Sequence, residues 1–290
     1  MKAIQEVVRD VRPHWVGNGF PVRSLFSYHP DPAAVSPFLL LDYAGPHTFA
    51  PTEVVRGVGE HPHRGFETVT IIYQGELEHR DSAGNRGRIG PGDVQWMTAA
   101  SGVVHEEYHS PTFTETGGTL EMVQLWVNLP AAEKMSPPRY QEILDSAISK
   151  VEVSDGNGTV RVIAGEFRGT RGPARTVTPI DVWDVRLNSG ASADLPVAEG
   201  RTTLLVVQQG TVRLNETQDA TGVELVRFDR TGSGVPVEAI EDAMLLVLSG
   251  EPIDEPVVGQ GPFVMNSRDE IRQAMLDYQS GHMGTLGSQT

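Results

Sequence analysis

Short segments in which apolar and polar residues alternate recur along the whole chain, with turn residues between them. Many are rich in Val, Ile and Thr, and Gly, Asn, Asp or Pro separates them. The clearest are 67–75, 92–99, 119–129, 159–167, 202–210 and 243–250. A period of two places successive side chains on opposite faces of a strand, and short strands at this spacing are typical of β-sandwiches and barrels. The pattern predicts an all-β fold.

Two segments have a helical pattern instead. Residues 267–279 open with Ser267 and Glu270, spaced three apart as in a capping box, and carry apolar residues on one face. These apolar residues are Ile271, Met275 and Tyr278. The segment 139–149 follows two prolines and predicts a short linker helix. Residues 281–290 predict a frayed or disordered tail.

A weak internal repeat divides the chain into two copies of one β-unit. The aligned pairs are Gly75 with Gly210, Gly102 with Gly234, and Met122 with Met244. Self-similarity of this kind indicates a repeated architecture, and the join falls around residues 130–150. The expected domains are an N-terminal metal-binding barrel over 1–135, a C-terminal barrel without metal ligands over 150–266, a helix over 267–280 and the tail 281–290.

Composition limits the classes of function. The 290 residues carry a formal net charge of -15, and such an acidic chain disfavours direct binding to a phosphate backbone. The absence of cysteine excludes disulfides, thiolate zinc sites and catalytic thiols. No stretch has the apolar length of a signal peptide core or a membrane span. We therefore expect a soluble, cytoplasmic monomer that binds neither nucleic acid nor membranes.

Four candidate metal ligands stand in two pairs, each two residues apart. His61 and His63 form one pair, and His105 and Glu107 form the other. On a strand each pair points to one face, so two facing strands would bring three imidazoles and a carboxylate together. Such a set suits a divalent first-row transition metal with positions left open for a small ligand.

The second copy lacks such ligands in this alignment. The residues aligned with the four candidates are Pro196, Ala198, Val237 and Ala239. None of these side chains is a usual metal ligand. One metal per chain is the expectation.

Three longer segments around these residues resemble the pirin family. They are HPHRGFETVT at 61–70, PGDVQWMTAASGVVHEE at 91–107 and GPFVMNSRDEI at 261–271. Pirins are bicupins, so the resemblance implies two tandem jelly-roll-like barrels. It extends over most of residues 10–280. By position it assigns the family's metal ligands to the same four residues and implies an iron-type centre. It also implies quercetin 2,3-dioxygenase activity for bacterial members and a nuclear transcription cofactor role for animal members.

The proposed reaction follows from flavonol chemistry. A flavonol has a 3-hydroxyl beside a 4-carbonyl, and binding through the 3-oxygen requires loss of its proton. Glu107 is interpreted as both metal ligand and base. The metal is expected to be Fe(II), with Mn, Co, Ni, Cu and Zn as alternatives, because affinity order alone does not choose. The alternative function is a metal-binding, redox-responsive regulatory protein with a protein partner and no turnover.

Neighbouring side chains receive supporting roles. The general cupin motif makes Glu67 a second candidate carboxylate; it shares the parity of His61 and His63 and is expected beside the metal ligands. Glu106 should be solvated, since adjacent strand residues face opposite ways. Arg64 is interpreted as structural. His47, His79 and His109 are interpreted as ordinary polar or turn residues, and His14 and His29 lie outside the paired pattern.

Aromatic residues near the candidate ligands have two interpretations. Trp96 and Met97 are expected in the core, or in an apolar pocket wall with Phe66 and Trp126. The segment 13–24 is interpreted as a loop and short strand near the barrel mouth.

Overall fold

The chain forms two β-units, and the computed structural model describes residues 1–287. We call them the N-terminal and C-terminal barrels. The N-terminal barrel comprises Arg12–Pro32, Phe38–Asp145 and the chain from Ile253 onward; the C-terminal barrel comprises Met1–Val11, Ala33–Pro37 and Ser146–Pro252. No helix in the described part is long and apolar enough to cross a membrane.

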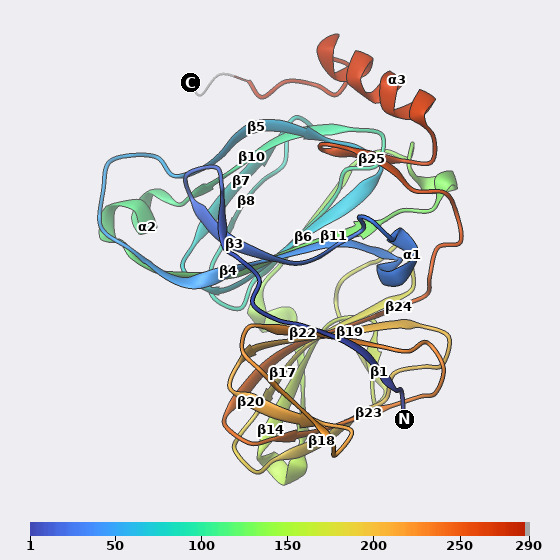
Figure 1. The fold of residues 1–290 in the computed structure, drawn as a ribbon. Coiled ribbons are helices and arrows are strands. Elements are labelled where there is room, and N and C mark those ends of the chain that lie inside the picture. The colour runs from blue at the N-terminus through green and yellow to red at the C-terminus, as the bar shows by residue number, and fades with distance from the viewer. Residues whose placement is uncertain (288–290) are drawn as a thin grey trace. The chain divides into compact units, whose positions relative to one another are not determined.

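The N-terminal barrel contains two antiparallel sheets (Figure 1). Over the described residues the larger sheet has the order β12 (Arg139–Ile143), β9 (Val94–Thr98), β6 (Phe66–Gln74), β11 (Gly118–Asn128), β4 (Phe38–Phe49), β3 (Phe20–Ser27) and β2 (His14–Val16). The smaller sheet has the order β5 (Gly57–His63), β10 (Val103–His109), β7 (Leu77–Asp81) and β8 (Arg86–Ile89). Helices α1 (Pro32–Val35) and α2 (Pro111–Thr116) and a 3-10 turn (Ala131–Glu133) lie in the connections.

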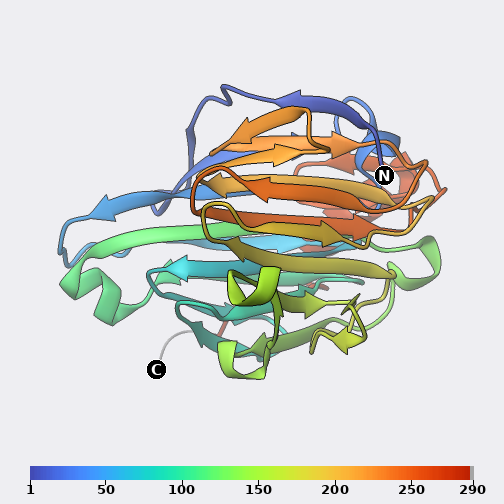
Figure 2. The ribbon, with the colours of Figure 1, turned by 90° about the horizontal axis from the view of Figure 1, so that it is seen from below.

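The C-terminal barrel repeats this arrangement (Figure 2). Within the described chain its larger sheet has the order β1 (Ile4–Val8), β22 (Glu224–Phe228), β19 (Thr202–Gln209), β24 (Ala243–Gly250), β17 (Ile180–Leu187), β14 (Gly158–Ala164) and β13 (Ser149–Val153). Its smaller sheet has the order β18 (Ser192–Leu195), β23 (Val235–Ala239), β20 (Thr211–Leu214) and β21 (Gln218–Thr221). A short hairpin, β15 (Glu166–Phe167) with β16 (Thr170–Arg171), and a turn at Ser154–Gly156 complete it.

Each barrel buries its core between its two sheets, as the alternation predicts. In the N-terminal barrel, Phe20 and Met122 from the larger sheet pack in one cluster with Leu77 and Ile89 from the smaller. Strand β7 shows the alternation directly, since every second residue from Leu77 is buried. The all-β prediction is confirmed.

The sheet edges change the expected domain boundaries. Strand β1 pairs with β22, so the first eleven residues belong to the C-terminal barrel and not to a domain over 1–135. Residues from Ile253 onward return to the N-terminal barrel instead of completing a domain over 150–266. The C-terminal barrel thus takes its edge strand β1 by hydrogen bonding to β22, which chain order does not reveal.

The linker helix predicted over 139–149 is wrong. Residues Arg139–Ile143 form β12, which pairs with β9, and a 3-10 turn (Asp145–Ala147) leads into β13. The unpaired edge of β9 offers backbone donors and acceptors, and pairing with that edge overrides a short helical pattern.

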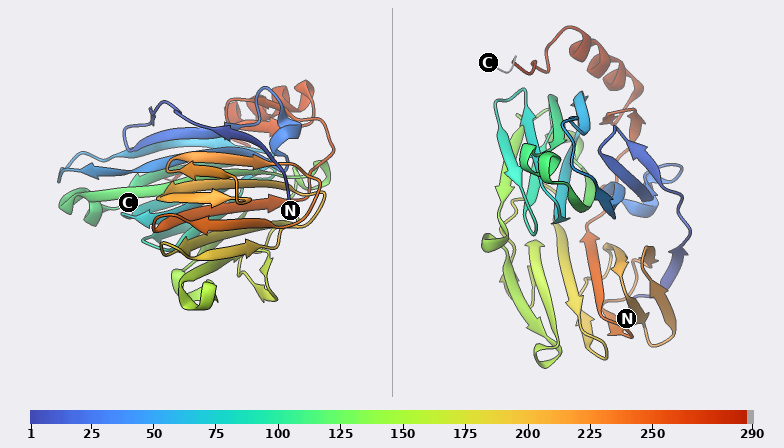
Figure 3. Two further views of the ribbon diagram at one scale, coloured as in Figure 1. Left: turned by 60° about the horizontal axis from the view of Figure 1, so that its bottom comes forward. Right: turned by 90° about the vertical axis from the view of Figure 1, so that its left-hand side faces the viewer.

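The C-terminal helix is present as α3 (Arg268–Gln279), after a hairpin of β25 (Val258–Gln260) and β26 (Phe263–Met265) (Figure 3). The N-cap forms as predicted: Ser267 Oγ accepts from the Glu270 backbone N–H at 3.3 Å, while the Glu270 carboxylate accepts from the Asn266 backbone N–H at 3.1 Å. The disordered tail predicted at 281–290 is corrected for its first part, because Met283 is buried at 4% exposure. Residues 288–290 lie outside the described residues.

Candidate metal centre

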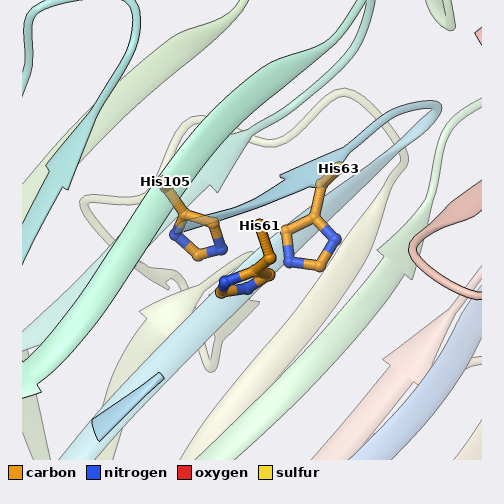
Figure 4. Close-up of side chains that lie close together, drawn as sticks. All are labelled: His61, His63 and His105. Carbon is orange, nitrogen blue, oxygen red and sulfur yellow. The ribbon is translucent and has the colours of Figure 1, made fainter. Parts of the chain in front are cut away.

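Two paired strands bring three of the predicted ligands together. Strands β5 and β10 are antiparallel, and His105 lies opposite His61 while Val103 lies opposite His63. The ring centroids of His61, His63 and His105 are 4.2 to 4.8 Å apart. Figure 4 shows the three rings converging on one space. One ring nitrogen from each lies within 4.8 Å of the others.

Hydrogen bonds on the outer side of each ring leave the Nε2 atoms facing this space. The Nδ1 atom of His61 is 2.8 Å from the Gly59 carbonyl oxygen, and Nδ1 of His63 is 3.4 Å from the Pro262 carbonyl oxygen. A carbonyl only accepts, so both Nδ1 atoms carry the proton and both Nε2 atoms keep a lone pair. Among the described residues the buried His105 Nε2 has no hydrogen-bond partner. Three such nitrogens fit a metal ion, whose histidine ligands use the second ring nitrogen for outer contacts.

The electrostatics keep two of these rings, those of His63 and His105, neutral. Burial, together with the neighbouring His61, lowers the pKa of His63 well below its usual value. Burial and the surrounding histidines lower the pKa of His105 in the same way. Neutral imidazole is the form that binds metals.

Glu107 lies on β10, as His105 does, but its carboxylate belongs to a different group of neighbouring ligand atoms from that of His61 and His63. A bulge separates His105 from Glu107 in the pairing with β5. Its Oε1 accepts a hydrogen bond from Gln95 Nε2 at 2.8 Å and one from Thr70 at 3.4 Å. The group of ligand atoms that contains Glu107 also contains His79 and His105. Glu107 nevertheless lines the same cavity as His61 and His63.

His79 was interpreted from sequence as an ordinary polar residue, which is wrong. It is buried, its Nε2 is 3.3 Å from Asp81 Oδ2, and its Nδ1 is 3.4 Å from His105 Nδ1. Gln95 also donates to His79 Nδ1 at 3.3 Å, so this nitrogen is an acceptor. His105 Nδ1 therefore carries a proton, which leaves the lone pair on its Nε2. The alternation of Leu77, His79 and Asp81 along one strand was the signal that would have found this residue.

Glu67 does not lie beside the histidines, contrary to expectation. Phe66 faces them, with its ring centroid 5.1 Å from that of His63, and the next strand residue points to the opposite face. There the Glu67 carboxylate accepts from Thr98 Oγ1 at 2.7 Å, and burial raises its pKa to about 7. The parity argument failed because Gly65, at φ +90°, breaks the strand between His63 and Phe66.

Two other polar neighbours have structural roles. Glu106 was expected to be solvated but is buried at 5% exposure, where it forms an ion pair with Arg80. A charged partner compensates the burial of its carboxylate. Arg64 is structural as predicted, because it donates to the Ser101 carbonyl at 2.6 Å and to Asp277 at 2.7 Å.

A cavity of about 400 Å³ opens beside the histidines. Its apolar lining includes Phe20, from the segment predicted to lie near the barrel mouth, and Trp126, whose ring packs 4.3 Å from that of Phe66. Trp96 and Met97 are fully buried, as expected of core residues. The polar lining is Asp42, His61, His63, Glu107 and Gln124. A largely apolar space with a few convergent polar groups is typical of a small-molecule site.

Both barrels match family models. The Pirin model matches residues 19–127, and the model of the Pirin C-terminal cupin domain matches residues 182–284. The chain belongs to the pirin family.

Two relatives are similar to this chain over nearly its whole length. A Pseudomonas aeruginosa protein named "putative quercetin 2,3-dioxygenase" is 56% identical over 287 residues, 97% of this chain and 98% of that protein. The crystal structure of a quercetin 2,3-dioxygenase from Acinetobacter baumannii is 49% identical, with a TM-score of 0.96 over 99% of this chain and 100% of that one. The bicupin fold is thereby confirmed.

A more distant pirin shares the fold. It is from Escherichia coli, was crystallised in complex with nickel(II), and is 22% identical, with a TM-score of 0.63 over 84% of this chain and 96% of that chain.

The C-terminal barrel of our chain holds apolar residues at the positions where its N-terminal barrel holds histidines. In the equivalent strands, Val237 lies opposite Ala193 and Val235 lies opposite Leu195. The positions equivalent to His61 and His63 are therefore Ala193 and Leu195, and not Pro196 and Ala198 as the sequence alignment suggested. Among the described residues the candidate metal groups lie in the N-terminal barrel.

Proposed function

We propose that this chain is a metal-dependent dioxygenase that cleaves flavonols of the quercetin type. His61, His63, His105 and Glu107 hold one divalent metal in this proposal. The observation that carries it is the convergence of three imidazoles, among them the buried His105 whose Nε2 has no hydrogen-bond partner in the described part of the chain, beside an apolar cavity. The Pseudomonas and Acinetobacter relatives, named for quercetin 2,3-dioxygenase, support the substrate class.

Iron is the proposed metal. Three imidazoles and one carboxylate accept several first-row ions, so manganese, cobalt, nickel, copper and zinc stay as alternatives. The nickel(II) in the Escherichia coli pirin supports a transition metal of this class. A bound metal would act as a Lewis acid at the flavonol 3-oxygen and provide open positions for a small ligand.

The cavity fits a flat aromatic substrate. Its volume of about 400 Å³ lies within the range usual for small-molecule sites. Phe20, Met122 and Trp126 contribute apolar lining that excludes water from the flavonol rings. His61 and His63 line the same space, so a substrate held there presents one edge to the histidines.

Glu107 is the proposed base. Its Oε1 accepts both hydrogen bonds that the structure shows, from Gln95 and Thr70, so its Oε2 is the atom proposed to receive the proton of the 3-hydroxyl. The amide of Gln95 is fixed in turn, because its Oε1 accepts from Tyr140 at 3.3 Å. Gln95 therefore holds the carboxylate in one orientation.

A cytoplasmic location and a monomeric state stay predictions.

The test is a binding and turnover assay on metal-loaded and metal-free protein. A flavonol should shift its near-ultraviolet absorption on binding the loaded protein only. Turnover should consume dioxygen and release carbon monoxide. An analogue that lacks the 3-hydroxyl should bind poorly, because it cannot donate the proton or form the chelate. If loaded protein neither binds nor cleaves flavonols, the proposal is wrong, and the regulatory alternative is then tested by partner capture with oxidised and reduced metal.

A further inference from the structure

We infer that the C-terminal segment positions the histidines, so that metal binding and the docking of this segment are energetically coupled. This segment, which we call the clamp, comprises residues 253–284 and contains β25, β26 and α3. The inference rests on the proposed metal site. It assigns to the clamp a role that its distance along the chain from the histidines does not suggest.

The clamp contacts the end of β5 directly. The Pro262 carbonyl lies 3.4 Å from His63 Nδ1 and also accepts from the Arg64 backbone N–H at 3.4 Å. The Arg64 carbonyl in turn accepts from the Val264 N–H at 3.0 Å. A Cβ at Gly65 would lie 2.0 Å from the Val264 carbonyl oxygen, so glycine is required for this close approach. The carbonyl that orients the His63 ring therefore belongs to the clamp.

Two buried basic side chains fasten the clamp at this point. Arg64, with a side chain only 4% exposed, forms an ion pair of 2.7 Å with Asp277 on α3. Lys134, fully buried, donates to the Val264 carbonyl at 2.9 Å and to the Gly65 carbonyl at 2.6 Å. A buried charge such as that of Arg64 destabilises a structure when its partner is removed. Undocking the clamp would therefore leave Arg64 without its carboxylate.

The clamp also contacts β10. Val104, which precedes His105, packs in one apolar cluster with clamp residues. These are Phe263, Met265, Ile271, Ala274 and Met283. Ser82 Oγ joins the two, since it accepts from the Val104 N–H at 3.0 Å and donates to the Met283 carbonyl at 2.6 Å. Both strands that carry histidines are thus backed by the clamp.

Coupling follows from these contacts by linkage. If docking the clamp holds His63 and His105 in the metal-binding arrangement, a metal bound to them must stabilise docking by the same factor. Outer partners of histidine ligands commonly change metal affinity by 10- to 100-fold. The outer surface of α3 is solvent-exposed, with Leu276 58% exposed.

The experiment uses Ni(II) as the probe, with the full chain and two measurements. The first is the Ni(II) dissociation constant, by competition with a chromophoric chelator. Asp277→Asn should raise it about 10-fold. The matched control Asp269→Asn, which removes an exposed partner of Arg272 on the same helix, should change it less than about twofold. The second is hydrogen exchange of the clamp in the wild type, which Ni(II) should slow.

The outcomes separate this inference from the proposed site. If the wild type binds Ni(II), Asp277→Asn binds it equally well and clamp exchange is unchanged, the coupling is wrong while the site stands. If Asp277→Asn does not fold, the wild-type exchange measurement decides alone. If the wild type does not bind Ni(II), the proposed metal site fails, and the coupling fails with it.

Discussion

His61 on β5 lies directly opposite His105 on β10, and their ring centroids are 4.2 Å apart. The antiparallel register sets this relationship. A slip of one residue would turn the histidines of one strand to the other face. The site is therefore built on a paired sheet instead of on loops, which is the more precise support for a set of metal ligands.

Removing one imidazole should remove the metal. We expect about one metal equivalent in the wild type and at least a 10-fold loss of affinity in His63→Ala, because a first-row site with three nitrogens loses one of its strongest donors. Elemental analysis after purification measures the stoichiometry, and competition with a chromophoric chelator measures the affinity. His14→Ala, at an exposed position on β2, is the control and should retain the metal. A wild-type stoichiometry near two would contradict the single site.

Substitution of Glu107 and of Glu67 should have different effects on flavonol turnover. Glu107→Gln should keep part of its metal and lose at least about 100-fold in flavonol turnover, because an amide cannot accept the proton. Glu67→Gln should stay within about threefold of wild type, since its carboxylate lies on the opposite face of β6 and accepts from Thr98. Steady-state rates with metal content measured on the same samples decide between them. The reverse ranking would move the chemistry to Glu67.

Glu67 should instead affect stability, with a defined sign. Burial raises its pKa from 4.5 to about 7, so the folded protein holds a proton that the unfolded chain releases between these values. The free energy of unfolding therefore falls as pH rises from about 4.5 to 7, by about 3 kcal/mol if the whole shift is expressed.

Glu67→Gln removes this titration, because glutamine resembles the protonated acid at every pH. The variant should match the wild type at pH 4.5 and exceed it in thermal stability at pH 8, measured by calorimetry on samples in the same metal state. Glu53→Gln, at an exposed position, is the control. Equal stability of wild type and Glu67→Gln at both pH values would show that Glu67 does not hold a proton at neutral pH.

His79 should support metal binding without being one of the proposed ligands. His79→Ala removes the acceptor for His105 Nδ1 and the contact to Asp81, and should weaken Ni(II) binding about 10-fold. His109→Ala is the matched control, because His109 is equally buried but hydrogen-bonds to the Gly19 carbonyl at 3.0 Å. Equal affinities in the two variants would assign His79 to packing alone.

Local alternation predicted the sheets and the three converging histidines, because both depend on a period of two within single strands. It failed where the chain leaves that period. Gly65 reverses the expected face of Glu67, and a bulge in β5 between Val58 and His61 accompanies the placement of Glu107 in a different group from His61 and His63. Local alternation also could not predict which distant segments pair with each other. The segment from Arg139 becomes a strand because β9 has a free edge, and alternation alone does not say which edge is free.

Asp42 should recognise hydroxyl groups of the substrate, a role that no motif of the sequence indicates. It lies in the cavity opposite Gln124 in the β4–β11 pairing, and burial raises its pKa while Ser24 donates to its Oδ1. Asp42→Ala should lower kcat/KM about 10-fold for quercetin, which carries several ring hydroxyls, and less than about twofold for unsubstituted 3-hydroxyflavone. The second substrate is the internal control, because it keeps the 3-hydroxyl that Glu107 is proposed to deprotonate. An equal loss for both substrates would mean that Asp42 only shapes the cavity, and no loss for either would place hydroxyl recognition elsewhere.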